Sequence, residues 1–113
     1  LREGREAHCA SGKPIRDFAS ARFVGEALAA LAASDATGPF NIASGEARSI
    51  GEVARFLGNA ARRPDLIRLG ALPDRPGDVP YMVADITRLR RRIGFTVPPD
   101  VEKDLLGMVG ATG

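Results

Sequence analysis

Two segments of the chain carry the apolar spacing of amphipathic helices, and this spacing constrains the fold more than any other feature. Over residues 24–31, apolar side chains fall at i, i+3, i+4 and i+7, and alanines at 29, 30, 32 and 33 favour a helix. Residues 50–57 repeat the spacing, directly behind an S-x-x-E capping box made by Ser49 and Glu52. The sequence therefore predicts two helices, each with one buried face.

The other expected elements are short. We expect a helix tail at 1–6, strands at 15–21, 40–43 and 66–69, a loop rich in proline at 72–80, and two last helices, 86–93 and from 101 onward. Asp85 and Asp100 are the expected caps of these last helices, with Gly94 ending the first and Val109 on the apolar face of the second. The order predicts a mixed α/β fold with a small sheet and flanking helices.

Composition limits the function classes. The 113 residues make one small domain, with 44% hydrophobic residues but only 5% aromatic ones, so the core must be largely aliphatic. A net charge of +2 is too small for a dedicated nucleic-acid binder, and no apolar run approaches the ~20 residues of a membrane span. The single cysteine permits no internal disulfide, which favours a reducing, cytoplasmic setting.

Residue types exclude several kinds of catalytic site. One histidine and one cysteine, adjacent at His8 and Cys9, give no metal-ligand spacing and a poor nucleophile pair. The chain has no glycine-rich loop for a dinucleotide or a phosphate, and no lysine stands four residues after its one tyrosine, Tyr81. We therefore expect no catalytic residue, no metal and no cofactor bound by this chain alone.

Two segments place arginine beside aspartate on a constrained backbone. Lys13–Phe18 contains Arg16 and Asp17, and Asp74–Pro80 contains Arg75 and Asp78. A guanidinium offers five donors that suit a diphosphate, and the carboxylate can orient it or accept from a sugar hydroxyl. Surface ion pairs of little energetic value explain the same residue types, and composition alone favours that alternative.

Five short motifs follow one another along the chain. They are R-D-F with V-G-E-A (residues 16–18 and 24–27), F-N-I-A-S-G-E (40–46), S-I-G-E-V-A (49–54), R-P-G-D (75–78), and A-D with I-G-F (84–85 and 93–95). Each motif alone is weakly specific. Their order and spacing resemble the C-terminal part of the extended short-chain dehydrogenase/reductase family, in its NAD-dependent epimerase/dehydratase group.

The resemblance implies a substrate-binding domain spanning residues 1–113, cut from a longer enzyme. In that family an N-terminal Rossmann domain binds NAD or NADP and supplies a Tyr-x-x-x-Lys pair, while the C-terminal part holds the substrate, often a nucleotide-diphosphate sugar. Carried over by motif, Arg16 and Arg75 would approach the diphosphate and Asp78 would reach the ribose. The parent would be an isomerase, dehydratase or oxidoreductase, and this chain alone would be inactive.

One departure from the family pattern and two alternative functions remain. Where the family usually has V-D-D-V, this chain has A-R-F-V (21–24), which replaces an acidic pair at a helix start. A stand-alone binding module without catalysis is the first alternative, and an Arg-rich interaction domain using the arginines of 88–92 is the second. A piece cut from a larger enzyme should also expose apolar surface, so we expect a homo-oligomer or other contacts through that face.

Overall fold

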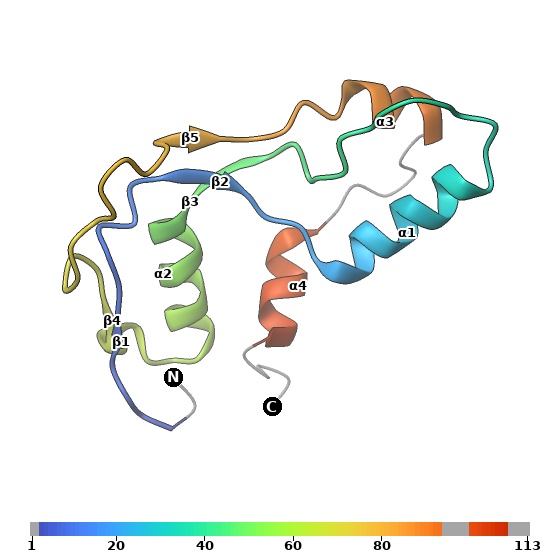
Figure 1. Ribbon diagram of the computed structural model, residues 1–113. Helices are drawn as coiled ribbons and strands as arrows, with labels where there is room; N and C mark the ends of the chain where they lie inside the picture. The colour runs from blue at the N-terminus through green and yellow to red at the C-terminus, as the bar shows by residue number, and fades with distance from the viewer. Residues whose placement is uncertain (1–2, 94–99, 109–113) are drawn as a thin grey trace.

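The computed structural model describes residues 3–93 and 100–108, which form short strands and four helices (Figure 1). In chain order the elements are β1 (Ala7–His8), β2 (Ile15–Asp17), α1 (Ala21–Ala32), β3 (Ala47–Ser49), α2 (Ile50–Ala60), the 3-10 helix η1 (Pro64–Leu66), β4 (Ile67–Arg68), β5 (Tyr81–Met82), α3 (Thr87–Ile93) and α4 (Val101–Met108). The fold is mixed α/β with small sheets and flanking helices, as the sequence predicts.

The strands form two small sheets. In one, β1 pairs in parallel with β4. In the other, β2 lies at the centre, antiparallel to β3 and parallel to β5. Arg16 on β2 lies opposite Arg48 on β3 and Met82 on β5. The central strand therefore brings Arg16 next to residues that are distant in sequence.

Strand β3 continues directly into α2, and Ser49 belongs to both. Its hydroxyl accepts from the Glu52 backbone N–H at 3.0 Å, and the Glu52 carboxylate accepts from the Ser49 backbone N–H at 3.4 Å. These two bonds are the capping box that the sequence predicts. The start of α2 is thereby fixed at the end of a strand of the central sheet.

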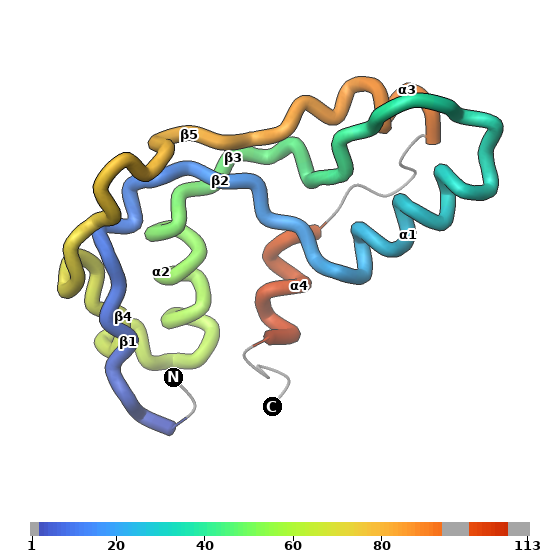
Figure 2. Tube along the Cα trace, viewed as in Figure 1, coloured from blue at the N-terminus to red at the C-terminus, as the bar shows by residue number. Residues whose placement is uncertain are grey.

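The buried apolar residues form small, aliphatic groups. Val53 on α2 packs with Val101 and Leu105 on α4, and the part-buried Phe18, Phe56 and Leu57 surround them. Farther along the molecule, α1 contacts α3, where Ala27 and Leu89 are buried. Figure 2 shows the two helix pairs at separate places along the chain trace. Among the described residues the helices therefore pack in pairs, α2 with α4 and α1 with α3.

Several expected elements are shorter or displaced. The predicted strand 40–43 is wrong, because the chain there pairs with no strand of the described part and β3 begins only at Ala47. Gly45, at φ 73°, turns the chain between the two places. The strand expected at 15–21 ends at Asp17, since Ser20 caps α1 by accepting from the Phe23 backbone N–H.

Other differences lie in the first residues and on helix faces. Residues 3–6 are not helical, so the expected helix tail is wrong for the described part of that segment. Leu28, expected on the buried face of α1, is 54% exposed. Asp85 and Asp100 do cap α3 and α4, as predicted: Asp85 accepts from the Thr87 backbone N–H and Asp100 from that of Lys103. Gly94 and Val109 lie outside the described residues.

The molecule is flat and extended. Its principal extents are 49 × 39 × 16 Å and its radius of gyration is 16.5 Å. A compact domain of this length has a radius of gyration of about 13 Å. The accessible surface is 7750 Å², against about 6,000 Å² for a compact protein of this mass. The chain therefore exposes far more surface than a self-contained domain does.

Candidate functional site

The site predicted from the sequence centres on Arg16, in the middle of strand β2. Its side chain is 22% exposed. One guanidinium nitrogen, Nη1, donates to the carbonyl of Ile15 at 2.8 Å. The other, Nη2, donates to Oδ1 of Asp78 at 2.9 Å. The guanidinium is therefore oriented by its own strand on one side and by a distant loop on the other.

The loop over residues 71–80 is tied to the segment before β2. The Leu72 N–H donates to the carbonyl of Cys9 at 3.0 Å, and the Ile15 N–H donates to that of Pro80 at 2.9 Å. Between these anchors, Asp74 accepts from the Ser11 backbone N–H at 2.9 Å. That bond, with further help from the Ser11 hydroxyl and the charge of Lys13, lowers the pKa of Asp74.

The R-P-G-D motif inside this loop is a β-turn. The Asp78 N–H donates to the carbonyl of Arg75 at 3.3 Å, and Gly77 has φ 74°. A type II turn requires a positive φ at its third residue, which glycine supplies, and commonly has proline at its second. Such a turn brings its two end residues within about 7 Å. The turn therefore places Arg75 beside Asp78, and so near Arg16.

The structure pairs the two motifs with each other. We expected each arginine to act with the aspartate of its own motif, but Arg16 bonds to Asp78 of the other motif. Arg75 is exposed, and within residues 3–93 and 100–108 its side chain makes no hydrogen bond or ion pair. Arg16 and Asp78 are thus in direct contact, and the β-turn places the backbone of Arg75 next to that of Asp78.

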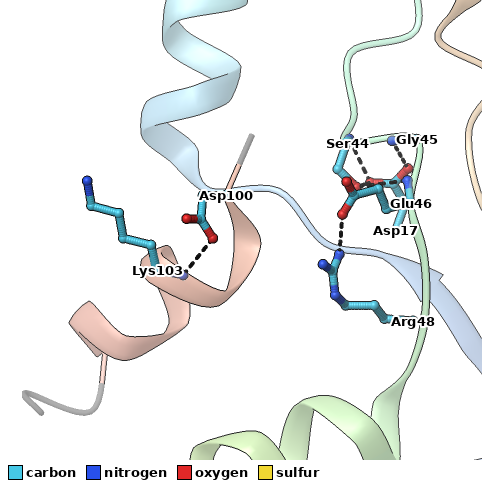
Figure 3. Close-up of polar contacts among 7 residues, drawn as sticks. All are labelled: Asp17, Ser44, Gly45, Glu46, Arg48, Asp100 and Lys103. Atoms are coloured by element: carbon cyan, nitrogen blue, oxygen red, sulfur yellow. Dashed lines mark hydrogen bonds and ion pairs between the residues drawn. The ribbon is translucent and has the colours of Figure 1, made fainter. Parts of the chain in front are cut away.

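Asp17 has a structural role that the sequence did not indicate. Its carboxylate accepts from the Ser44 backbone N–H at 2.8 Å, from the Ser44 hydroxyl at 2.7 Å and from the Gly45 backbone N–H at 2.8 Å (Figure 3). Ser44 is only 2% exposed. Asp17 therefore fixes the turn before β3 and does not orient Arg16.

A second ion pair lies on the neighbouring strand. Arg48 donates from Nη1 to the Glu46 carboxylate at 2.7 Å (Figure 3), and the arginine side chain is 22% exposed. Arg48 also lies directly opposite Arg16 in the β2–β3 register. Like charges at opposed positions destabilise a sheet unless each has a partner. Asp78 and Glu46 supply those partners.

Two exposed apolar residues follow the loop on β5. Tyr81 is 58% exposed and Met82 is 56% exposed. Met82 lies opposite Arg16 in the parallel register. Large exposed apolar side chains beside a charged site are typical of a surface that another molecule covers. The sequence did not predict this strand, because two residues carry no alternation pattern.

Two of the four arginines of α3, Arg88 and Arg92, are engaged within the chain. Arg88 donates to the carbonyls of Thr37 and Pro39 and lies 4.7 Å from the centre of the Phe40 ring. Arg92 forms an ion pair with Asp35. These residues line an open cavity of about 760 Å³. The intramolecular contacts weaken the case for a free arginine face on α3.

The described residues contain neither a metal-ligand group nor a membrane-spanning helix. No group of three or more metal-ligating side chains occurs among residues 3–93 and 100–108. His8 bonds through Nε2 to Glu6 at 2.9 Å, and the Cys9 thiol donates to the carbonyl of Ala7 at 3.5 Å. Among the same residues, no helix has the length and apolar character to cross a membrane.

Comparisons with known proteins give matches in solved structures. No protein-family model matches the chain, and no curated protein matches it. The UDP-N-acetylglucosamine 4-epimerase from Methanobrevibacter ruminantium M1, solved with UDP-N-acetylmuramic acid, matches with a TM-score of 0.80 and 27% identity, over 98% of this chain. MoeE5 with UDP-glucuronic acid and NAD matches with a TM-score of 0.77 and 28% identity, over 99% of this chain.

A further MoeE5 structure, with UDP-glucose and NAD, matches with a TM-score of 0.76 and 28% identity. This chain covers 35% of the epimerase chain and 38% of the MoeE5 chains. It therefore spans little more than a third of the length of these proteins. The chain is a mixed α/β structure that matches one part of a Rossmann-type UDP-sugar epimerase chain.

Proposed function

We propose that this chain is the C-terminal, substrate-binding part of an NAD(P)-dependent sugar-nucleotide epimerase, dehydratase or reductase. In this proposal it holds a nucleotide-diphosphate sugar against a cofactor that an N-terminal Rossmann domain binds. Arg16 and Arg75 bind the diphosphate, and Asp78 accepts from the ribose hydroxyls. The single free cysteine, Cys9, is consistent with a cytoplasmic enzyme.

The observation that carries the proposal is the contact between Arg16 and Asp78. It joins two motifs separated by 62 residues and brings the Arg16 guanidinium onto the carboxylate of Asp78, which ends the same β-turn that Arg75 begins. Guanidinium forks suit diphosphates and carboxylates suit sugar hydroxyls, so the set matches the chemistry of a nucleotide sugar. The matched solved structures hold UDP-sugars, which agrees with that ligand class.

The large exposed surface of the chain supports the proposal that a second domain covers part of it. Its accessible surface of 7750 Å² exceeds the value for a compact protein of this mass by nearly 2,000 Å². Met82 lies exposed beside Arg16, its partner in the β2–β5 register. A Rossmann domain seated here would cover Met82 and enclose the substrate between the two parts. Ligands commonly bind at such domain interfaces.

Within this division of labour the chain binds and orients. NAD or NADP, held by the other domain, would supply hydride transfer, and MoeE5 was solved with NAD. Binding energy from the diphosphate and ribose, far from the reacting carbon, is what enzymes convert into rate. Arg16 and Arg75 would therefore affect turnover of the parent enzyme without touching the reacting atoms.

Isothermal titration calorimetry with UDP-glucose tests the proposal. Each of Arg16→Ala and Arg75→Ala should weaken binding by about tenfold or more, because each removes charge-assisted hydrogen bonds to the diphosphate. Arg63→Ala is the matched control, since Arg63 is paired only with Asp65 in the described structure and lies outside the site. Unaltered binding in both site variants would refute the assignment.

The coding sequence upstream of Leu1 separates the enzyme from a stand-alone binding module. The proposal expects a G-x-x-G-x-x-G strand-turn-helix and a Tyr-x-x-x-Lys pair in that reading frame. A stop codon or an unrelated sequence there, with UDP-glucose binding intact, would favour the binding module. An Arg-rich interaction domain would instead show nucleic-acid binding that falls steeply with salt.

A further inference from the structure

We propose that Asp78 determines specificity at this site by excluding anions that carry no hydroxyl donors. The inference rests on the proposed function and extends it to the question of which anions the site rejects. It starts from the position of the Asp78 carboxylate, 2.9 Å from the Arg16 guanidinium. Any anion that approaches Arg16 must approach Asp78 as well.

The carboxylate is held in place over Arg16. The type II turn at 75–78 sets its position on one side, with Gly77 at φ 74°. On the other side, the Pro80 carbonyl accepts from the Ile15 N–H at 2.9 Å, two residues after Asp78. Asp78 therefore lies between a rigid turn and a strand-pairing bond, and a simple swing of the loop does not remove it.

The chemistry of the pair favours one class of ligand. A deprotonated carboxylate only accepts hydrogen bonds, and inorganic pyrophosphate near neutral pH presents mainly acceptor oxygens. Pyrophosphate at Arg16 would therefore be repelled by the negative charge of Asp78 and would donate no hydrogen bond to it. A nucleoside diphosphate brings ribose hydroxyls that can donate to Asp78 while its phosphates bind the arginines. The site thus rejects free pyrophosphate and accepts a nucleoside diphosphate, because the Asp78 carboxylate repels the former.

The ion pair between Arg16 and Asp78 is weak enough for a ligand to replace it. The arginine side chain is 22% exposed and the aspartate side chain 40% exposed. Exposed ion pairs contribute little to stability, so a ligand that satisfies both partners can replace the bond between them at small cost. A ligand that satisfies only Arg16 leaves Asp78 beside a new negative charge.

The test compares two probes, UDP and inorganic pyrophosphate, by calorimetry on the 113-residue chain. Asp78→Asn keeps the shape and removes the charge. We expect it to raise pyrophosphate affinity by about tenfold, and to lower the ratio of UDP affinity to pyrophosphate affinity by at least as much. Glu46→Gln is the matched control, because Glu46 neutralises Arg48 on the neighbouring strand with similar exposure. It should leave the ratio unchanged.

The outcomes separate this inference from the proposed function. If Asp78→Asn weakens both probes equally, Asp78 positions Arg16 and the inference is wrong. Unchanged affinities, or an equal rise in Glu46→Gln, would also overturn it. If the wild type binds neither probe but Asp78→Asn gains pyrophosphate binding, the exclusion holds and the nucleotide assignment fails. If neither protein binds either probe, both fail. Circular dichroism of each variant checks that the fold is retained.

Discussion

At the scale of single residues, Asp17 shows how one carboxylate organises a turn. Three donors converge on it, two backbone N–H groups and the hydroxyl of Ser44, which is 2% exposed. A buried donor that loses its acceptor incurs its full desolvation cost, because water does not reach it. Asp17 thereby joins the end of β2 to the turn that leads into β3.

Replacement of Asp17 by alanine should therefore destabilise the chain strongly. We expect a loss of about 2–3 kcal/mol in the free energy of unfolding, measured by urea titration followed by circular dichroism. Asp65→Ala is the control, since Asp65 forms only an exposed pair with Arg63 in the described structure. That variant should leave the unfolding midpoint nearly unchanged. Equal shifts in the two variants would contradict the role given to Asp17.

The site residues and the structural residue differ in how far the sequence could predict them. Arg16, Arg75 and Asp78 stand out because their motifs and spacing resemble a known family. The pairing of Arg16 with Asp78 spans 62 residues, and that of Asp17 with Ser44 spans 27. No local pattern encodes such contacts, so the motifs indicated the candidate residues, while the pairing of one motif with the other is visible only in the structure.

At the scale of elements, the helices behind clear apolar spacing were more predictable than the strands: β2 and β4 form inside the expected segments 15–21 and 66–69 but are shorter, and none forms at 40–43. The helix signals are local: Ser49 caps α2, Asp100 caps α4, and apolar spacing marks the faces between. The strands have two or three residues each and depend on pairing with distant segments. Residues 40–43 have strand-like composition, but the turn at Gly45 gives the pairing position beside β2 to Ala47–Ser49 instead.

The tether between Asp74 and Ser11 gives the loop of residues 71–80 a pH dependence. The Ser11 N–H bond lowers the pKa of Asp74 below its ordinary value of 3.8. A lowered pKa means that folding favours the charged form, so the tether stabilises the loop above pH 3.8 and is lost as the pH falls below it. We expect the Ser11 amide resonance to titrate with a midpoint below 3.8.

A matched variant isolates this titration. Asp74→Asn removes the charge but keeps an oxygen acceptor, so the Ser11 amide should no longer follow that midpoint in NMR spectra recorded from pH 6 to pH 2. The amide of Leu72, which donates to the carbonyl of Cys9, is an internal reference within the same loop. A Ser11 titration that persists in Asp74→Asn would show that another group is responsible.

At the scale of the whole molecule, surface area and shape both indicate a chain that leaves much of its surface uncovered. The slab is 16 Å thin, and most of its buried apolar residues in the described part lie on two helix pairs, α2 with α4 and α1 with α3. Hydrophobic stabilisation scales with the apolar area removed from water, so a chain that leaves so much surface exposed gains less from folding alone. The surface that another domain would cover remains available for other contacts.

The chain studied alone should therefore self-associate through β5, where Tyr81 and Met82 are both exposed. Light scattering should report a mass that rises with concentration, and the double variant Tyr81→Ser, Met82→Ser should reduce that rise. Leu28→Ser is the control, because Leu28 is 54% exposed and lies on α1, away from β5 (Figure 1). A clean monomer at high concentration would argue against the exposed interface. Loss of association in the control alone would move the contact to α1, because apolar side chains that meet in a dimer are the ones whose removal weakens it.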